Sequence, residues 1–284
     1  MGARALDRRG LSSNRLPVPK LSKQPCALII AGSDSGGGAG VQIDLKVLAS
    51  LGVHGTSAIT CVTAQNPKQV TAIQACKADI VRAQIDAVFE GFSPKAVKTG
   101  MLYSASVIRA VAEFFRSRRK PPLLIVDPVM VATSGARLLR PSAQRALTVE
   151  LLPLASLVTP NLSEAEILTG DKIVEVEELR AAARKIHSQF GCAALVKGGH
   201  LRGLDDAVDF YFDGDTELLL KAPFVKGVST HGTGCSYSAA IAGYVALGCE
   251  LGYAVEMAKQ HITQSIAQSV LVGRHSVLNS FWED

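Results

Sequence analysis

The segment THGTGCS, residues 230–236, opens a stretch of small residues that predicts a long helix. Free backbone amides at the start of a helix bind anions, and the positive end of the helix dipole stabilises charge on a phosphoryl group in transfer. Cys235 lies at this helix start, where a lowered pKa would let its thiol act as a nucleophile or accept a proton. A buried structural cysteine is the alternative. Position alone leaves both interpretations of Cys235 open.

A second glycine cluster, AGSDSGGGAG at residues 31–40, lies between a predicted strand and a predicted helix. Its glycines allow the backbone to approach a ligand closely, and the amides of the following helix can hold an anion or a polar group. The segment lacks the lysine of a GxxxxGK[ST] phosphate loop, and its glycine spacing fits a dinucleotide fingerprint poorly. We expect a ligand-binding loop here, because a simple tight turn needs fewer glycines.

Polar side chains follow three further predicted strands. Asp127 ends one of them, Asn161 and Glu164 follow the next, and Lys197 precedes two glycines at the end of a third. Ligands of open α/β sheets bind at the carboxyl ends of strands, so these residues can meet at one edge. A carboxylate there suits magnesium, and a lysine suits phosphates. Taken singly, Asp127 is as easily a turn residue, and Asn161 and Glu164 a helix cap and a first-turn acid.

Gln65, Met101 and Val129 also follow or end predicted strands. An amide with apolar neighbours suits a flat heteroaromatic ligand, whereas core packing is the alternative for Met101 and Val129.

The six histidines show no metal-ligand spacing, so no structural metal is predicted. The six cysteines contain no CxxC pair, which argues against a zinc site or a disulfide framework and favours a reducing compartment.

Short apolar strands and helical patterns alternate from about residue 26 onward. Strands are predicted at 27–31, 54–64, 70–75, 96–99, 123–127, 156–159 and 194–197, followed by a β-pair at 207–212 and 217–221. Helices are predicted at 41–52, 80–89, 104–115, 142–152, 164–168 and 177–190, and two more begin at Cys235 and Tyr253. This alternation predicts an α/β fold, with a mostly parallel central sheet between helices on both faces in a three-layer sandwich. No repeat or linker divides residues 25–284, so we expect a single domain there.

The composition of the 284-residue chain, 48% hydrophobic and 19% charged, predicts a folded globular protein. Its net charge of +5 comes from residues 1–24, which hold six Lys and Arg against one Asp. This basic segment predicts a disordered extension, with an organelle transit peptide as the alternative. The balanced remainder argues against a nucleic-acid partner. The most apolar stretch, Ser238–Val255, contains Glu250 and suits a packed helix, so we expect a soluble, cytoplasmic protein without a membrane partner.

Taken together, these segments resemble the hydroxymethylpyrimidine/phosphomethylpyrimidine kinases of thiamine biosynthesis, within the ribokinase-like superfamily. The resemblance covers about residues 26–270 and rests on seven motifs in the family's order: AGSDSGGGAGVQIDLK, VTAQN, KTGML, VDPVMVATSG, LVTPNLSEAE, LVKGGH and THGTGCS. It implies an ATP- and Mg²⁺-dependent phosphotransferase, commonly a homodimer. Such an enzyme phosphorylates 4-amino-5-hydroxymethyl-2-methylpyrimidine, and then phosphorylates the monophosphate to the diphosphate.

The resemblance also assigns roles to individual residues. Gln65 would hydrogen-bond the aminopyrimidine, in a pocket completed by Gly32, Ala39, Asp44, Met101 and Val129. The ATP and Mg²⁺ side would comprise Asn161, Glu164, Lys197, Asp127 and Thr233. The anion hole would be formed by Gly232, Gly234 and Cys235. Most of the superfamily has an aspartate general base at the position of Cys235, whereas the pyrimidine kinases have a cysteine, which favours a catalytic thiolate here.

Two parts of the chain depart from the family pattern, and other functions remain open. Residues 1–24 have no counterpart, and the C-terminal segment lacks the glycine-histidine-glycine-proline run often found there. The nearest alternative is a pyridoxal or pyridoxine kinase, because its substrate is also a flat, methylated nitrogen ring with a hydroxymethyl group. A non-catalytic sensor with the same fold is less consistent with the intact Cys235, Asn161, Glu164 and Lys197. The sequence leaves open whether both phosphorylation steps occur.

Overall fold

The computed structural model describes residues 23–130, 139, 141–199, 201, 203–225, 227–228 and 231–282. Most of the predicted basic extension, residues 1–24, therefore lies outside the described residues. So do residues 131–135 of the VDPVMVATSG motif, His200 of LVKGGH and Thr230 of THGTGCS. Within the described part of the chain, no helix combines the length and the apolar character that a membrane crossing requires.

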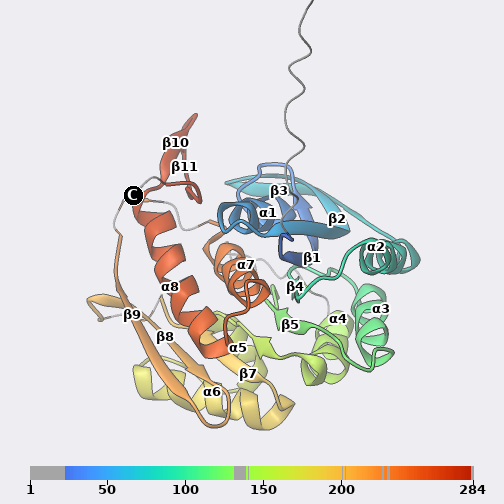
Figure 1. Ribbon diagram of the computed structural model, residues 1–284. Coiled ribbons are helices and arrows are strands. Elements are labelled where there is room, and N and C mark those ends of the chain that lie inside the picture. The colour runs from blue at the N-terminus through green and yellow to red at the C-terminus, as the bar shows by residue number, and fades with distance from the viewer. Residues whose placement is uncertain are drawn as a thin grey trace, which may run out of the picture.

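The centre of the fold is a nine-stranded sheet in the order β3-β2-β1-β4-β5-β6-β7-β8-β9 (Figure 1). The strands are β1 (Cys26–Asp34), β2 (His54–Asn66), β3 (Gln69–Ala75), β4 (Ala96–Thr99), β5 (Leu123–Val126), β6 (Leu157–Val158), β7 (Ala193–Lys197), β8 (Asp206–Phe212) and β9 (Glu217–Pro223). The strands from β2 to β7 pair in parallel, whereas β3, β8 and β9 join antiparallel at the two edges. The predicted mostly parallel sheet is confirmed.

Helices cover both faces of this sheet. The helices α1 (Gly40–Ser50), α7 (Thr233–Ala246) and α8 (Leu251–Ala267) pack on one face. The other face carries α2 (Ala78–Gly91), α3 (Ala105–Arg116), α4 (Pro141–Ala146), α5 (Leu162–Thr169) and α6 (Val176–Phe190). The three-layer sandwich predicted from the alternating pattern is therefore confirmed.

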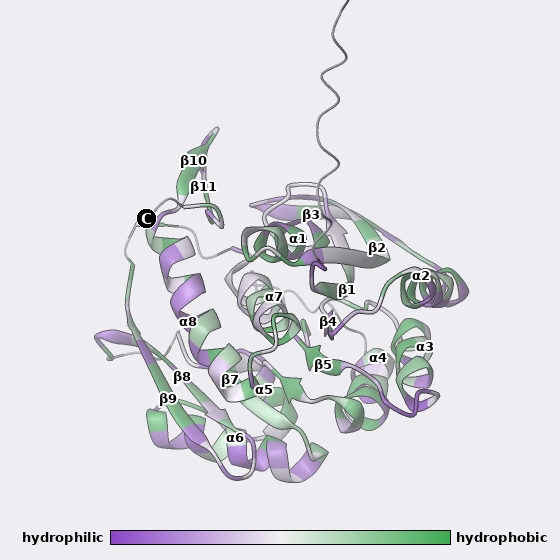
Figure 2. Ribbon diagram, in the orientation of Figure 1, coloured by the Kyte–Doolittle hydropathy of each residue, from purple (hydrophilic) through white to green (hydrophobic). Residues whose placement is uncertain are grey.

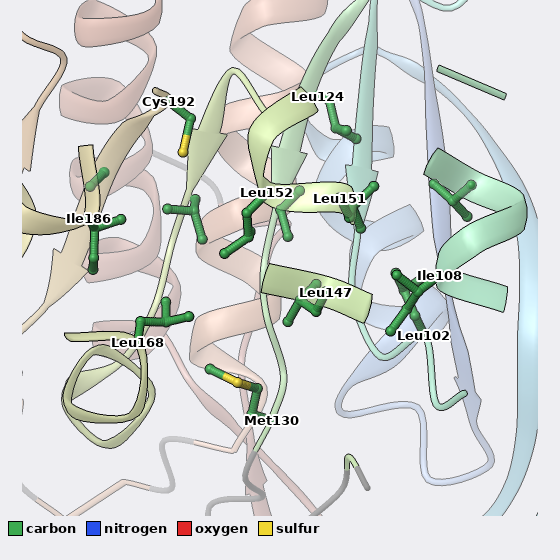
Figure 3. Packing of buried hydrophobic residues seen from close by; sticks show 14 of the residues in the cluster. Leu102, Ile108, Leu124, Met130, Leu147, Leu151, Leu152, Leu168, Ile186 and Cys192 are labelled. Carbon is green, nitrogen blue, oxygen red and sulfur yellow. The ribbon is translucent and has the colours of Figure 1, made fainter. Parts of the chain in front are cut away.

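Each face of the sheet has its own hydrophobic core. Figure 3 shows part of the core beneath α2 to α6, with Ile108, Leu124 and Leu151 among the side chains that fill this layer. In Figure 2 the central strand β5 is hydrophobic, whereas α6 and α8 alternate between hydrophilic and hydrophobic residues. This pattern follows from geometry, because a central strand of a sandwich is buried on both faces while an outer helix buries one stripe.

Local structure differs from the sequence prediction in three places. The strand predicted to end at Ala31 continues to Asp34, because Ser33 and Asp34 still pair with β2. The helix predicted over 142–152 widens into a π-helical turn at residues 147–151 and ends in a 3₁₀ turn at residues 152–154. Pro153 lacks the amide that would continue an α-helix there. A hairpin of β10 (Val270–Val272) and β11 (His275–Val277) was not predicted.

The chain reverses its direction across the sheet at β1. The chain runs outward from β1 to β2 and β3 on one side, and it then returns to place β4 on the other side of β1. Such a switch point separates the loops that follow the two neighbouring strands and leaves a crevice at their carboxyl ends. A ligand site is therefore expected above the carboxyl ends of β1 and β4.

Candidate active site

A cavity of about 410 Å³ lies at this position, above the carboxyl ends of the parallel strands. Its volume is within the range of small-molecule sites. The structure brings thirteen of the predicted site residues to its wall: Gly32, Ala39, Gln65, Met101, Asp127, Val129, Asn161, Glu164, Lys197, Gly232, Thr233, Gly234 and Cys235. Asp44 does not line the cavity and is fully buried behind it.

The glycine-rich loop between β1 and α1 is shaped by Asp34, a residue that sequence reasoning missed. Its buried carboxylate accepts hydrogen bonds from the amides of Gly36, Gly38 and Ala39 at 2.8–3.2 Å. Burial alone would raise the pKa of Asp34, but the nearby His231 and these amides lower it overall. The loop is therefore held by a carboxylate that stays ionised.

The loop before α7 contacts this glycine-rich loop directly. Gly232 has φ +84°, and a Cβ there would collide with the carbonyl oxygen of Gly38. Only glycine satisfies both conditions, because side chains disfavour this φ and the space is occupied. The amides that follow Gly232 open α7, which makes this loop an anion site at a helix N-terminus. The hydroxyl of Thr233 is buried there without a hydrogen-bond partner among the described residues.

Cys235 lies in the first turn of α7, partly buried at the wall of the cavity. Burial raises the pKa of its thiol to about 11, against a lowering by Lys98 and by the amide of Gly40. The lowered pKa that a helix start can produce is therefore not found at Cys235. The physical reason is that desolvation, together with Asp44 and Asp127, outweighs the stabilising groups.

Asp127 and Lys197 form an ion pair beside this loop, with 3.1 Å between Nζ and Oδ1. The hydroxyl of Ser238 in α7 donates to the other carboxylate oxygen of Asp127 at 3.2 Å. Burial alone would lower the pKa of Lys197, but Asp127 and Glu164 raise it overall, so the ammonium stays charged. A Cβ on Gly234 would lie 3.1 Å from the Lys197 ammonium, which places that charge against the start of α7.

Glu164 and Asn161 form a capping box at the start of α5. The Glu164 carboxylate accepts the amides of Asn161 and Met130 at 3.0 and 2.9 Å, and the Asn161 side chain accepts the amide of Glu164 at 3.0 Å. Burial and the neighbouring Asp127 raise the pKa of Glu164 to about 7, although Lys197 opposes this. Both the helix-cap and the cavity interpretations of these residues are therefore correct.

The cavity wall also carries the residues predicted for a flat ring. Thr63 lies 3.1 Å from the side-chain oxygen of Gln65, and the Gln65 backbone bonds Ser35 in both directions at 2.8 Å. Val129 has φ +43°, a strained value for a β-branched residue. Met101 and Val129 line the cavity and are only partly buried, so they do not belong to the packed core.

Asp44 pairs with Lys98, a second residue that sequence reasoning missed. The distance between Lys98 Nζ and Asp44 Oδ2 is 2.7 Å, and both side chains are fully buried. Lys98 lines the cavity, so Asp44 reaches the site through Lys98. The signal in the sequence was a lysine inside the otherwise apolar strand AVKT.

The fold and the site together define a small-molecule phosphotransferase of the ribokinase-like class. A sequence profile described as phosphomethylpyrimidine kinase matches residues 34–279. The chain belongs to the phosphomethylpyrimidine kinase family. A hydroxymethylpyrimidine/phosphomethylpyrimidine kinase from Rhizobium meliloti is 51% identical over 242 residues, which span 85% of this chain and 90% of the relative.

Two solved structures extend this comparison. A phosphomethylpyrimidine kinase from Clostridium difficile is 41% identical with a TM-score of 0.77, covering 86% of this chain and all of the other. A pyridoxal kinase from Bacillus subtilis, solved as an ADP complex, is 33% identical with a TM-score of 0.82, covering 91% of this chain and 98% of the other. The predicted family and fold class are confirmed. The higher identities lie with the pyrimidine kinases, which favours them over the pyridoxal alternative.

Proposed function

We propose that this protein uses ATP to phosphorylate 4-amino-5-hydroxymethyl-2-methylpyrimidine, and then phosphorylates the resulting monophosphate to the diphosphate. One observation carries the proposal: a thiol, a helix N-terminus, a charged lysine, a side-chain amide and apolar side chains all line a single cavity. The proposal agrees with the names of the relatives. Assembly as a homodimer rests only on the family resemblance, and a cytoplasmic location rests only on the sequence pattern.

The end of the cavity near Gln65 suits the pyrimidine ring. The side-chain amide of Gln65 supplies both a donor and an acceptor, which a ring nitrogen and its adjacent amino group can match. Gly32 also lines the cavity, and a Cβ there would come within 2.8 Å of the Cys61 sulfur, so packing against Cys61 favours glycine. Met101 and Val129 would be apolar neighbours of the ring.

The end near α7 suits the phosphates of ATP. The amides after Gly232 and the Lys197 ammonium provide positive charge where the transferring phosphoryl group gains negative charge. ATP as the phosphoryl donor is consistent with the ADP complex of the related pyridoxal kinase. The buried hydroxyl of Thr233, which has no hydrogen-bond partner in the described part of the chain, would be available to the phosphates.

Asp127 and Glu164 are the residues that would hold Mg²⁺, with Asn161 positioning Glu164. Oxygen ligands of this kind fit a hard divalent cation. Burial and the charge of Asp127 raise the pKa of Glu164, and a bound cation would favour its ionised form. A bound Mg²⁺ would neutralise charge on the phosphate oxygens.

Cys235 is proposed to accept the proton of the substrate hydroxyl. As the hydroxyl oxygen bonds to the γ-phosphorus, the bond from that phosphorus to the β,γ-bridging oxygen breaks and ADP leaves. The hydroxyl proton moves to the sulfur of Cys235 in its thiolate form, and the resulting thiol returns the proton to solvent. Gly232 and Gly234 shape the backbone that orients the amides toward the phosphoryl oxygens during this step.

The proposal is tested by mass-spectrometric product analysis with ATP and Mg²⁺. The pyrimidine, its monophosphate and pyridoxal are offered separately to the wild type and to Cys235→Ala. We expect the wild type to form the diphosphate and Cys235→Ala to lose nearly all of this activity. Cys249→Ala serves as the control, because Cys249 is also partly buried but lies beyond the other end of α7. Turnover of pyridoxal alone would assign a vitamin B6 kinase, and ligand binding without any turnover would assign a sensor.

A further inference from the structure

The buried ion pair of Lys98 and Asp44 is poorly suited to a purely stabilising role. Both side chains are fully buried, and moving two charges out of water costs more than one contact of 2.7 Å returns unless the other polar atoms are also satisfied. The second carboxylate oxygen of Asp44 is buried without a hydrogen-bond partner among the described residues. An incompletely satisfied buried pair calls for another explanation.

The pair lies directly behind the proposed phosphoryl-transfer site. Lys98 extends from β4 and Asp44 from α1, and both elements pack against α7, which carries Cys235. Gly100 leaves room for the ammonium, because a Cβ at that position would lie 3.1 Å from Lys98 Nζ. The ammonium therefore reaches the cavity wall that Cys235 also lines.

Charged and titratable groups on several elements act on Cys235 or line the same cavity, among them Asp44, Lys98, Asp127, Lys197, His231 and Lys259. Each of the four basic groups among them also faces a carboxylate, and Lys98 itself pairs with Asp44. Lys197 pairs with Asp127, Lys259 pairs with Asp209 at 2.7 Å, and His231 lies beside Asp34. Lys98 is the strongest of the charges that favour the thiolate form of Cys235.

We propose that Lys98, at the cavity wall beside α7, is a positioning residue that supplies the counter-charge for the Cys235 thiolate, whereas Asp44 opposes it. This inference deepens the proposed function and rests on it. A thiol that must accept a proton has to be present as the thiolate, and burial disfavours that form. A fixed ammonium at the same cavity wall offsets part of this penalty.

The pair makes a directional prediction. Lys98 lowers the pKa of Cys235, whereas Asp44 raises it. Neutralising Lys98 should therefore raise the pKa of the thiol, and neutralising Asp44 should lower it. A merely structural pair would behave differently, because the loss of either partner would disturb the site in the same way. Opposite signs of the two pKa shifts would therefore indicate a counter-charge role, and equal signs a merely structural role.

The test follows alkylation of Cys235 by iodoacetamide across a pH series, with each cysteine quantified by peptide mass spectrometry. Well below the thiol pKa, the alkylation rate changes about tenfold for each unit of pKa shift. We expect Lys98→Met to slow alkylation at least tenfold at neutral pH, Asp44→Asn to accelerate it, and Lys98→Arg to restore much of the wild-type rate. In the kinase assay, Lys98→Met should lower kcat while leaving KM for the pyrimidine nearly unchanged.

Two controls keep the test decisive. Removing one partner of a buried pair can unfold a protein, so the double variant Lys98→Met with Asp44→Asn is included and should give an intermediate alkylation rate. Alkylation of Cys249 in the same samples reports any general opening of the fold. Equal rates in all variants, or shifts of one sign in both single variants, would overturn the inference. Because alkylation needs neither ATP nor pyrimidine, failure of the proposed function would show separately, as absent turnover with the expected thiol shifts.

Discussion

Replacing Gly232 by alanine tests how strictly the contact between the two glycine-containing loops is required. A left-handed φ costs a side-chain-bearing residue about 1–2 kcal/mol. At Gly232 the new Cβ would also collide with the Gly38 carbonyl oxygen, so one of the two loops must shift. Overpacking of this kind adds about 1–3 kcal/mol, which gives a total loss of stability of about 2–5 kcal/mol.

Gly191→Ala is the matched control for this substitution. Gly191 has φ +73°, close to the +84° of Gly232, but no atom lies within 4 Å of the Cβ that alanine would add. It ends α6, which lies on the opposite face of the sheet from α7. Gly191→Ala should therefore report the backbone cost alone, as a loss of about 1–2 kcal/mol with unchanged kinase activity.

Urea unfolding and steady-state kinetics on both variants give the two quantities needed. A displaced loop misaligns the amides that stabilise the phosphoryl group, and loss of one such donor lowers kcat by about 10²–10³. We expect a drop of this size in Gly232→Ala only. Equal stability losses in the two variants, or normal kcat in Gly232→Ala, would show that the collision is relieved without moving the anion site.

Two further predictions concern pH. The pKa of Glu164, raised by burial to about 7 from its ordinary 4.5, implies a stability contribution that is complete below pH 4.5 and lost as pH rises through 7. Relative to Glu164→Gln, the wild type should lose about 3 kcal/mol between about pH 4 and about pH 8. The pKa of His261, lowered by burial to about 4 from 6.5, implies stability present above pH 6.5 and lost as pH falls through 4. His261→Phe, which keeps a ring against Trp282, should lack the corresponding loss of about 3 kcal/mol.

Chemical denaturation at a series of pH values measures both effects as differences between wild type and variant. The difference in unfolding free energy between wild type and variant is the useful quantity, because other groups titrate in the same pH range. Their contributions cancel when the two proteins are compared. For Glu164, added Mg²⁺ should recover part of the stability lost near pH 8. If the unfolding free energy of wild type and variant changed with pH in the same way, the shifted pKa of Glu164 or of His261 would be contradicted.

The alternating strands and helices were predictable because each depends on local pattern. The run AVKT is short, β-rich and followed by glycine, and it forms β4 as expected. The strand-end positions of Asp127, Asn161 and Lys197 followed from the same reasoning, because carboxyl ends of parallel strands share one edge. The family resemblance then supplied roles that spacing alone left open.

What the sequence did not reveal depends on contacts between distant segments. Lys98 and Asp44 are 54 residues apart, and only the packing of α1 over β4 brings them together. The raised pKa of Cys235 follows from burial in the folded protein, which a helix-start argument cannot estimate. The β10–β11 hairpin did carry a signal, since VLV and HSV flank a glycine in a turn. Each strand has only three residues, which was too short for a strand prediction in the C-terminal segment.

The contact between Gly38 and Gly232 joins segments almost two hundred positions apart, and this has a consequence for biosynthesis. A chain emerging from the ribosome exposes β1 and α1 long before α7 and α8 exist to cover the core they share. Long-range contacts of this kind slow folding, because the entropy of closing the intervening chain is lost before the contact forms. The catalytic cavity is therefore among the last features to assemble, and C-terminally truncated chains should be inactive and prone to aggregate.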